Sequence, residues 1–377
     1  MSNGLRELHQ LGQSVWLDFI SRDLISSGTL TRMIAEDGLR GMTSNPSIFQ
    51  KAVSGNAYDE EIAALAATGL DGTAIFDRLA IADVSAACDA FLPVYEESGG
   101  RDGFVSIEVS PDLAYDAERT LDEARRLFAA VGRANVLIKI PGTPEGLPAI
   151  YQALREGINI NITLLFSLEQ YLAVADAYVR ALEDRHAAGE PIDQVASVAS
   201  FFVSRSDSLV DSLLDEKLEQ ADEQQRARLA GLHGKLGVAN SKIVYEHFAE
   251  LLAGERWAKL AAAGAPPQRV LWASTSTKNP AYRDVLYVEE LIGPDTVNTL
   301  PEATYAAFKD HGVVARTVDQ DLHAAHAHME ALAAAGIDID AANAKLLADG
   351  VDLFVAAFDK AVEIVAGRRA ELTGSAG

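Results

Sequence analysis

The chain has 377 residues, of which 49% are hydrophobic and 23% are charged, as in a folded globular protein with a sizeable core. Its 32 Lys and Arg face 55 Asp and Glu, and a net charge of −23 would repel a polyanion, so we expect no nucleic-acid partner. The first residues lack the apolar core of a signal peptide, and no uncharged apolar run approaches the roughly 18 residues of a membrane span.

The single cysteine, Cys88, cannot form an internal disulfide and lies in a helical-looking run, so its expected role is packing. This cysteine usage fits a reducing compartment. We therefore expect a cytoplasmic protein with no membrane partner. The sequence gives no indication of the oligomeric state.

Eight short apolar stretches are predicted to be strands, and helical periodicity follows most of them. In chain order they are residues 15–19, 41–46, 103–109, 135–141, 158–166, 195–203, 269–274 and 296–301. This alternation predicts an α/β protein with a single parallel (β/α)8 barrel of the TIM type. An open doubly wound sheet fits less well, because no Gly-x-Gly-x-x-Gly motif follows the first strand.

The connections between these strands contain predicted helices. They include residues 21–36, 58–67, 73–91, 147–155, 168–182, 209–232 and 241–253. The connection after the sixth strand is longer than the others, which predicts a helical insertion at about 207–265, and C-terminal helices are expected at about 302–370. No shift in composition marks a boundary, so we expect residues 1–377 to form one barrel domain with these additions.

Residues 135–141 read Asn-Val-Leu-Ile-Lys-Ile-Pro, a predicted buried strand with one amine, that of Lys139, at its centre. Burial of a charged lysine costs several kcal/mol unless a partner or a shifted pKa relieves it. A structural ion pair would supply such a partner, and so would a catalytic site. The strand by itself does not decide between the two.

Polar residues late in different strands are expected to face one another, because TIM-barrel enzymes carry their active sites at the carboxyl ends of the strands. Candidates at these positions are Asp18, Asn45, Glu108, Lys139, Asn161, Thr163, Ser200, Arg205 and Lys278. Each has a structural alternative: Asp18 could cap a helix, Asn45 could belong to a turn, and Arg205 could be a surface cation. Two acids and a buried amine at one end of a barrel are harder to explain in this way.

An amine in an apolar pocket can attack a ketone, and the protonated imine that results is an electron sink for cleavage of the adjacent carbon–carbon bond. One carboxyl group must move protons as the carbinolamine forms and dehydrates, and another must take the proton of the hydroxyl on the departing carbon. Glu108 and Asp18 suit these two tasks. Arg205 and Lys278 would hold a phosphate through charge-assisted hydrogen bonds.

Five motifs, in order along the chain, resemble those of the transaldolase family. They are residues 43–47 (TSNPS), 106–109 (SIEV), 137–141 (LIKIP), 161–167 (NITLLFS) and 272–275 (WAST). The resemblance is to a longer bacterial subgroup of the class I aldolase superfamily. It implies transfer of a dihydroxyacetone unit from a ketose phosphate (sedoheptulose 7-phosphate or fructose 6-phosphate) to an aldose phosphate (glyceraldehyde 3-phosphate or erythrose 4-phosphate) in the pentose phosphate pathway, without a cofactor or metal.

The resemblance also implies roles for individual residues. Lys139 would form the imine, and Glu108 would shuttle protons through a water held near Thr163. Asp18 would act as acid and base at the cleaved hydroxyl. The substrate-binding residues would be Thr43, Asn45, Asn161, Ser200, Arg205 and Lys278.

Two departures from the shorter bacterial members concern the cations. Residues 201–205 (FFVSR) replace a Pro-Phe-Val-Gly-Arg run of those members. In those members an Arg usually follows Ala-Ser-Phe, whereas here a lysine, Lys278, takes its place two residues further along the chain. Simple cleavage of the fructose 6-phosphate aldolase type is the nearest alternative, but those aldolases tend to lack the counterpart of Glu108.

A metal-dependent barrel lyase or isomerase is a second alternative, for which histidine ligands would be expected. The only histidine cluster is His323, His326 and His328, with no carboxylate strand motif beside it. A barrel retained as a binding or scaffold protein is a third alternative, which would not need the lysine and both acids.

Overall fold

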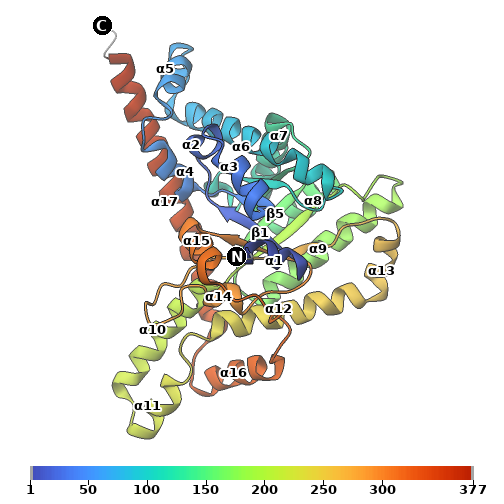
Figure 1. Ribbon diagram of the computed structural model, residues 1–377, viewed down its shortest axis with the longest axis vertical. Coiled ribbons are helices and arrows are strands. Elements are labelled where there is room, and N and C mark those ends of the chain that lie inside the picture. The colour runs from blue at the N-terminus through green and yellow to red at the C-terminus, as the bar shows by residue number, and fades with distance from the viewer. Residues whose placement is uncertain (1–2, 375–377) are drawn as a thin grey trace.

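The computed structural model describes residues 3–374, which form a closed parallel barrel surrounded by helices (Figure 1). Each strand pairs with the next, and β8 pairs with β1, so the sheet has no free edge. The strands are β1 (Gln13–Asp18), β2 (Gly41–Thr43), β3 (Phe104–Glu108), β4 (Val136–Pro141), β5 (Ile160–Leu165), β6 (Ser197–Phe202), β7 (Arg269–Ala273) and β8 (Thr296–Leu300). The predicted TIM barrel is confirmed, and every predicted strand overlaps an observed one.

Alternation along the strands determines which side chains point into the barrel. Trp16, Leu137 and Leu271 are fully buried in one cluster inside it, whereas their strand neighbours pack against the outer helices. Lys139 follows Leu137 by two residues, so it lies on the same interior face. The polar residues at the carboxyl ends therefore continue an apolar interior.

Most of the helices before β6 cover the outside of the barrel. They are α1 (Gly4–Gln10), α2 (Arg22–Ser26), α3 (Thr29–Arg32), η1 (Met33–Asp37), α4 (Pro46–Val53), α5 (Asp59–Ala67), α6 (Gly72–Glu97), η2 (Pro111–Leu113), α7 (Ala117–Val131), α8 (Leu147–Arg155) and α9 (Leu168–Ala187). One continuous helix was predicted over residues 21–36, and this prediction is wrong. Gly28 adopts a left-handed conformation (φ 75°) and separates α2 from α3.

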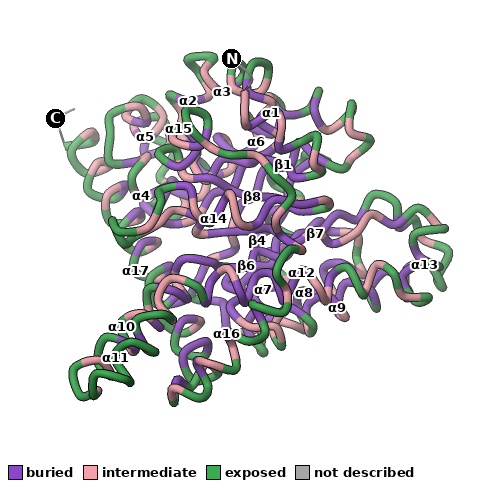
Figure 2. Tube along the Cα trace, turned by 60° about the horizontal axis from the view of Figure 1, so that its bottom comes forward, coloured by how far each residue is buried: buried purple, intermediate pink, exposed green. Residues whose placement is uncertain are grey.

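Four helices lie between β6 and β7: α10 (Ser204–Gln220), α11 (Glu223–Ala230), α12 (Leu236–Ala253) and α13 (Glu255–Ala262). One continuous helix was predicted over 209–232, and this is wrong. Ala221 is extended, and Asp222 starts α11 with a capping box to Gln225. The hairpin of α10 and α11 extends away from the barrel, and Figure 2 shows that its tip is largely exposed.

Helix α14 (Leu286–Glu289) lies between β7 and β8, and β8 is followed by α15 (Glu302–His311), α16 (Leu322–Ala334) and the long α17 (Ile339–Gly374). Three residues of α17, Leu346, Val351 and Phe354, belong to the same buried cluster as the barrel interior. This helix therefore covers the carboxyl end of the barrel. Within residues 3–374, no helix combines the length and the apolar character that crossing a membrane would require.

Candidate active site

A cavity of about 210 Å³ opens at the carboxyl end of the barrel. It contains most of the polar residues predicted for the site: Asp18, Thr43, Asn45, Lys139, Thr163, Ser200, Arg205 and Lys278. Glu108 and Asn161 do not line it. They lie directly behind it, because Glu108 contacts Lys139 and Asn161 accepts a hydrogen bond from Ser200.

Lys139 lines this cavity and is 5% exposed. Its Nζ donates to the Ser44 carbonyl oxygen at 3.2 Å and lies 3.2 Å from Oε2 of Glu108. The ring of Phe354, from α17, lies 5.4 Å from the same nitrogen. The amine thus has one carboxylate, one carbonyl and one aromatic face around it.

Glu108 is the last residue of β3, and its side chain is 4% exposed. Burial raises the pKa of this carboxyl group to about 7, although the positive charge of Lys139 opposes the shift. Its Oε1 atom has no hydrogen-bond partner within residues 3–374. A carboxyl group that titrates near neutral pH can both accept and donate a proton.

Asp18 ends β1, which is separated from β3, the strand of Glu108, by β2 alone. Its Oδ1 accepts a hydrogen bond from Oγ1 of Thr43 at 2.8 Å, and that hydroxyl lies 2.7 Å from Oγ1 of Thr299. Burial raises the pKa of Asp18, and the charge of Lys139 and the bond from Thr43 both oppose the rise. Two threonines from β2 and β8 therefore hold this carboxyl group in place.

Asn161 and Ser200 form a chain of hydrogen bonds across the barrel interior. Oγ of Ser200 donates to Oδ1 of Asn161 at 2.7 Å, and Nδ2 of Asn161 donates to Oγ of Ser106 at 2.9 Å. These bonds fix the amide orientation of Asn161. Ser200 lines the cavity above it.

Thr163 lines the cavity, and its hydroxyl is buried. Oγ1 has no hydrogen-bond partner in the described part of the chain, although the residue is completely buried. The pairing of β5 with β6 is irregular between Ile162 and Leu165, and Leu164 has a φ of 60°. Such irregularities redirect side chains next to functional sites, and a free buried hydroxyl is suited to holding a water.

Arg205 and Lys278 bring two cations to the outer part of the cavity. Arg205 was predicted at the end of the sixth strand, and this is wrong, because β6 ends at Phe202 and Arg205 lies in the first turn of α10. Its guanidinium lies over the rings of Phe202 (5.0 Å) and Phe354 (6.0 Å). Its Nη1 has no hydrogen-bond partner among residues 3–374, and burial lowers its pKa.

Lys278 lies in the loop after β7 and donates to Oγ of Ser276 at 2.7 Å. Burial, followed by the nearby Arg205 charge, lowers its pKa. Neither cation forms an ion pair with a carboxylate of the described residues. Two such cations in one cavity can bind a phosphate.

Asn45 combines a structural contact with its place on the cavity wall. Its backbone is extended (φ −156°), as a following proline favours, and its Oδ1 caps α4 by accepting from the Ile48 amide at 3.0 Å. The cap fixes the side chain where the amide lines the cavity.

Sequence reasoning missed Phe202, Thr299 and Phe354, which also line the cavity. Thr299 could have been found from its place near the end of the eighth strand. Phe354 carries no local signal, because it lies within an ordinary helical stretch and reaches the site only through the packing of α17.

The three histidines considered as metal ligands lie on α16. Within residues 3–374, no group of three or more His, Cys, Asp or Glu side chains could hold a metal ion. His326 instead contacts Oε2 of Glu246 at 2.7 Å.

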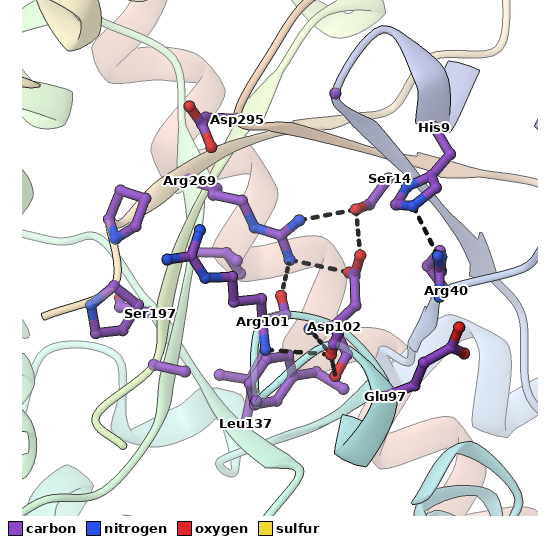
Figure 3. Close-up of a pocket in the computed structure, with 18 residues that line it drawn as sticks. His9, Ser14, Arg40, Glu97, Arg101, Asp102, Leu137, Ser197, Arg269 and Asp295 are labelled. Atoms are coloured by element: carbon purple, nitrogen blue, oxygen red, sulfur yellow. Dashed lines mark hydrogen bonds and ion pairs between the residues drawn. The ribbon is translucent and has the colours of Figure 1, made fainter. Parts of the chain in front are cut away.

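A second cavity, of about 410 Å³, lies at the amino-terminal end of the barrel (Figure 3). Asp102 is its central acid and accepts from Oγ of Ser14 (2.6 Å), Nε1 of Trp16 (3.2 Å) and Nη2 of Arg269 (3.0 Å). Arg269 in turn donates to Ser14 at 2.8 Å. The buried charges of this second cavity are paired with each other, whereas the two cations at the carboxyl end have no carboxylate partner among the described residues. This difference favours the carboxyl end of the barrel as the functional one.

Comparison with known proteins matches residues 15–365 to the family described as Transaldolase/Fructose-6-phosphate aldolase. A transaldolase of Trichodesmium erythraeum is 49% identical over 377 residues, covering 99% of both chains. Transaldolases of Frankia alni and Neisseria gonorrhoeae are 48% and 44% identical, covering 94% of this chain in each case and 94% and 97% of their own lengths. The chain therefore belongs to the transaldolase/fructose-6-phosphate aldolase family of enzymes.

Proposed function

We propose that the protein is a transaldolase that moves a dihydroxyacetone unit from a ketose phosphate to an aldose phosphate through a Schiff base on Lys139. The observation that carries this proposal is the contact between Nζ of Lys139 and the carboxylate of Glu108 at 3.2 Å, at the wall of a cavity that Asp18 and two cations also line. The relatives named transaldolase, which match nearly the whole chain, support the same reaction.

In the first half of the reaction, Lys139 gives up a proton and attacks the C2 carbonyl of the ketose. Glu108 has a pKa raised to about 7, so it can receive the proton and return it, through a water held at Thr163, as the carbinolamine loses water. The product is a protonated imine. Its positive charge draws electrons from the bond between C3 and C4.

Asp18 then takes the proton from the C4 hydroxyl, so that the C3–C4 bond breaks and the aldose phosphate leaves. The three-carbon unit stays on Lys139 as an enamine. It attacks the aldehyde of the acceptor, Asp18 returns its proton, and hydrolysis of the new imine frees Lys139. Thr43 and Thr299 keep Asp18 in place through this cycle.

The remaining polar residues would bind the substrate. Arg205 and Lys278 would hold the phosphate at the outer end of the cavity. The three-carbon unit on Lys139 would be oriented by Thr43, Asn45 and Ser200, with Asn161 acting through its hydrogen bond with Ser200.

We place this reaction in the pentose phosphate pathway, in a chain organised as one barrel domain. Sedoheptulose 7-phosphate and fructose 6-phosphate would be the donors. A cytoplasmic location would fit the single, buried Cys88.

Borohydride reduction in the presence of fructose 6-phosphate, followed by peptide mapping, tests the mechanism. We expect a covalent adduct on Lys139 and none in Lys139→Ala. An adduct at another residue, or none, would overturn the Schiff-base proposal. Activity that is lost with a chelator and restored by a divalent cation would favour a metal-dependent enzyme instead.

Transfer and simple aldol cleavage are separated by the fate of the three-carbon unit. With fructose 6-phosphate and erythrose 4-phosphate, a transaldolase makes sedoheptulose 7-phosphate and little free dihydroxyacetone. Release of dihydroxyacetone at the same rate with and without the acceptor would instead support the aldolase alternative.

A further inference from the structure

Arg205 lies in the wall of the active-site cavity and is held there by aromatic rings. Its Cζ is 5.0 Å from the ring centroid of Phe202 and 6.0 Å from that of Phe354. Its Nη1 is buried and has no hydrogen-bond partner in the part of the chain that the structure describes. A buried guanidinium without a carboxylate needs another contact to keep it in place, and the face of an aromatic ring provides one.

An aromatic ring holds a guanidinium in a different way from a carboxylate. The ring attracts the positive charge through its negative face and accepts none of the in-plane N–H groups as a carboxylate would. A carboxylate would take up the same N–H donors that bind a phosphate. Contacts with rings therefore fix the cation and leave its donors available, as the free Nη1 of Arg205 shows.

The two rings belong to different parts of the fold. Phe202 is the last residue of β6, so the barrel itself fixes its position. Phe354 lies on α17, is 3% exposed, and also has its ring centroid 5.4 Å from Nζ of Lys139. One ring from the C-terminal helix thus contacts both the proposed nucleophile and the proposed phosphate ligand.

Gly350 lies four residues before Phe354 and therefore on the same face of α17. A Cβ atom at this position would lie 2.9 Å from Cδ2 of Leu164 and 3.6 Å from Nη1 of Arg205. Glycine weakens a helix relative to alanine, so its presence in the middle of α17 calls for a local reason. Here it lets the helix approach β5 and Arg205 closely enough for the Phe354 ring to reach both cations.

We propose that Phe354 is a positioning residue for phosphate binding, whose ring holds the Arg205 guanidinium beside Lys139 and leaves its N–H groups free for the phosphate. This inference rests on the proposed function and adds to it a residue outside the barrel strands. The C-terminal helix then contributes to the preference for phosphorylated sugars, and Gly350 allows the close approach on which this depends.

Two variants remove the ring and keep an apolar side chain: Phe354→Leu and Phe354→Met. Hydrophobic replacements of similar volume are the ones that a core tolerates best. Phe358→Leu is the matched control, because it makes the same change one turn further along α17, where the ring packs edge-on against Phe76 at 5.4 Å. This control measures what the loss of ring packing on α17 does by itself.

The first measurement is kcat/KM for fructose 6-phosphate and for unphosphorylated fructose, expressed as the ratio of the two. A change around Lys139 affects both sugars and cancels in this ratio, whereas a displaced Arg205 affects only the phosphorylated one. We expect the ratio to fall about 3- to 10-fold in both Phe354 variants, mainly through the KM for fructose 6-phosphate. Phe358→Leu should keep the ratio of the unaltered protein.

The same substitution in an Arg205→Ala background tests whether Phe354 acts through Arg205. With no guanidinium left to position, Phe354→Leu should change the ratio by less than about twofold. A loss in this background as large as in the unaltered protein would show that Phe354 acts independently of Arg205 and would overturn the proposal.

The second measurement is the dissociation constant of inorganic phosphate, obtained by calorimetry, which requires no imine chemistry. We expect it to rise about 3- to 10-fold in both Phe354 variants and to stay unchanged in Phe358→Leu. If one Phe354 variant does not fold, the other decides.

The outcomes separate this proposal from the proposed function. An unchanged sugar ratio and unchanged phosphate binding in the Phe354 variants, with a normal borohydride adduct on Lys139, would overturn the positioning role and leave the Schiff-base function intact. Weaker phosphate binding in these variants, with no adduct in the unaltered protein, would overturn the Schiff-base function and leave the positioning role in place.

Discussion

Glu108 and Lys139 are register partners on the adjacent strands β3 and β4, and their side chains meet at 3.2 Å inside the barrel. Neighbouring residues of paired parallel strands point to the same face, so the backbone of the sheet brings this acid and this base together. Their geometry depends on the barrel and not on a mobile loop. An acid–base pair held in this way is already positioned before a substrate binds.

The raised pKa of Glu108 predicts a pH dependence of stability. Between the ordinary value of 4.5 and the folded-state pKa of about 7, the folded protein holds a proton that the unfolded chain has released. The stabilisation that this proton gives the folded protein is therefore complete below about pH 4.5. It is lost as the pH rises through 7, which lowers the free energy of unfolding by about 3 kcal/mol.

Glu108→Gln removes this titration. Between pH 4.5 and pH 8, we expect the free energy of unfolding of the unaltered protein to fall relative to that of the variant. Urea unfolding of both proteins at each pH measures this difference. The comparison of two proteins cancels the titration of groups that they share. A difference that stays constant across this range would show that Glu108 is not the buried acid that the structure indicates.

Asp18→Asn should separate imine formation from carbon–carbon cleavage. An amide cannot take the proton of the C4 hydroxyl, so cleavage should slow by about 10²- to 10⁴-fold while Lys139 still forms its adduct. Mass spectrometry after borohydride trapping with fructose 6-phosphate distinguishes the cases. The variant should carry the whole six-carbon sugar phosphate on Lys139, and the unaltered protein should also carry the three-carbon unit. Rapid appearance of the three-carbon adduct in the variant would remove Asp18 from the mechanism.

The barrel could be predicted from the sequence because its signals are local. Each strand is a short apolar run, and alternation within it determines that Lys139 shares a face with Leu137. The helical break at Ala221 was missed, although the capping pair Asp222 and Gln225 is visible in the sequence, because the apolar face continues across it.

Other features of the site depend on tertiary packing and left no local signal. Phe354 reaches Lys139 and Arg205 only because α17 folds back over the end of the barrel. The free hydroxyl of Thr163 depends on the irregular pairing near Leu164, which no propensity predicts.

The two cations should differ in their effect on substrate binding. Arg205 has an unpaired buried nitrogen and two aromatic neighbours, whereas Lys278 is more exposed and already bonded to Ser276. A charge-assisted hydrogen bond is worth about 1.5–3 kcal/mol, so Arg205→Ala should raise the KM for fructose 6-phosphate about 10- to 100-fold. Lys278→Ala should raise it less.

Unphosphorylated fructose provides the control for both substitutions. Because it lacks the phosphate, the two variants should use it as well as the unaltered protein does, at matched concentrations. Equal losses with both sugars would mean that the cations support the fold of the cavity and not the phosphate. A larger effect of Lys278 than of Arg205 would reverse the assignment of the main phosphate ligand.

Asp102, at the opposite end of the barrel, should affect stability and leave catalysis unchanged. Its side chain is 6% exposed and pairs with Arg269, whose side chain is 13% exposed, so Asp102→Ala leaves a largely buried guanidinium without its carboxylate. Breaking such a pair costs about 3–5 kcal/mol.

Asp295→Asn is the matched control, because the Asp295 side chain lines the same cavity without a hydrogen bond to the described residues. This substitution should change the free energy of unfolding by less than about 0.5 kcal/mol. Urea unfolding and kcat/KM measured on both variants check the prediction. A fall in kcat/KM for folded Asp102→Ala would contradict the assignment of separate roles to the two ends of the barrel.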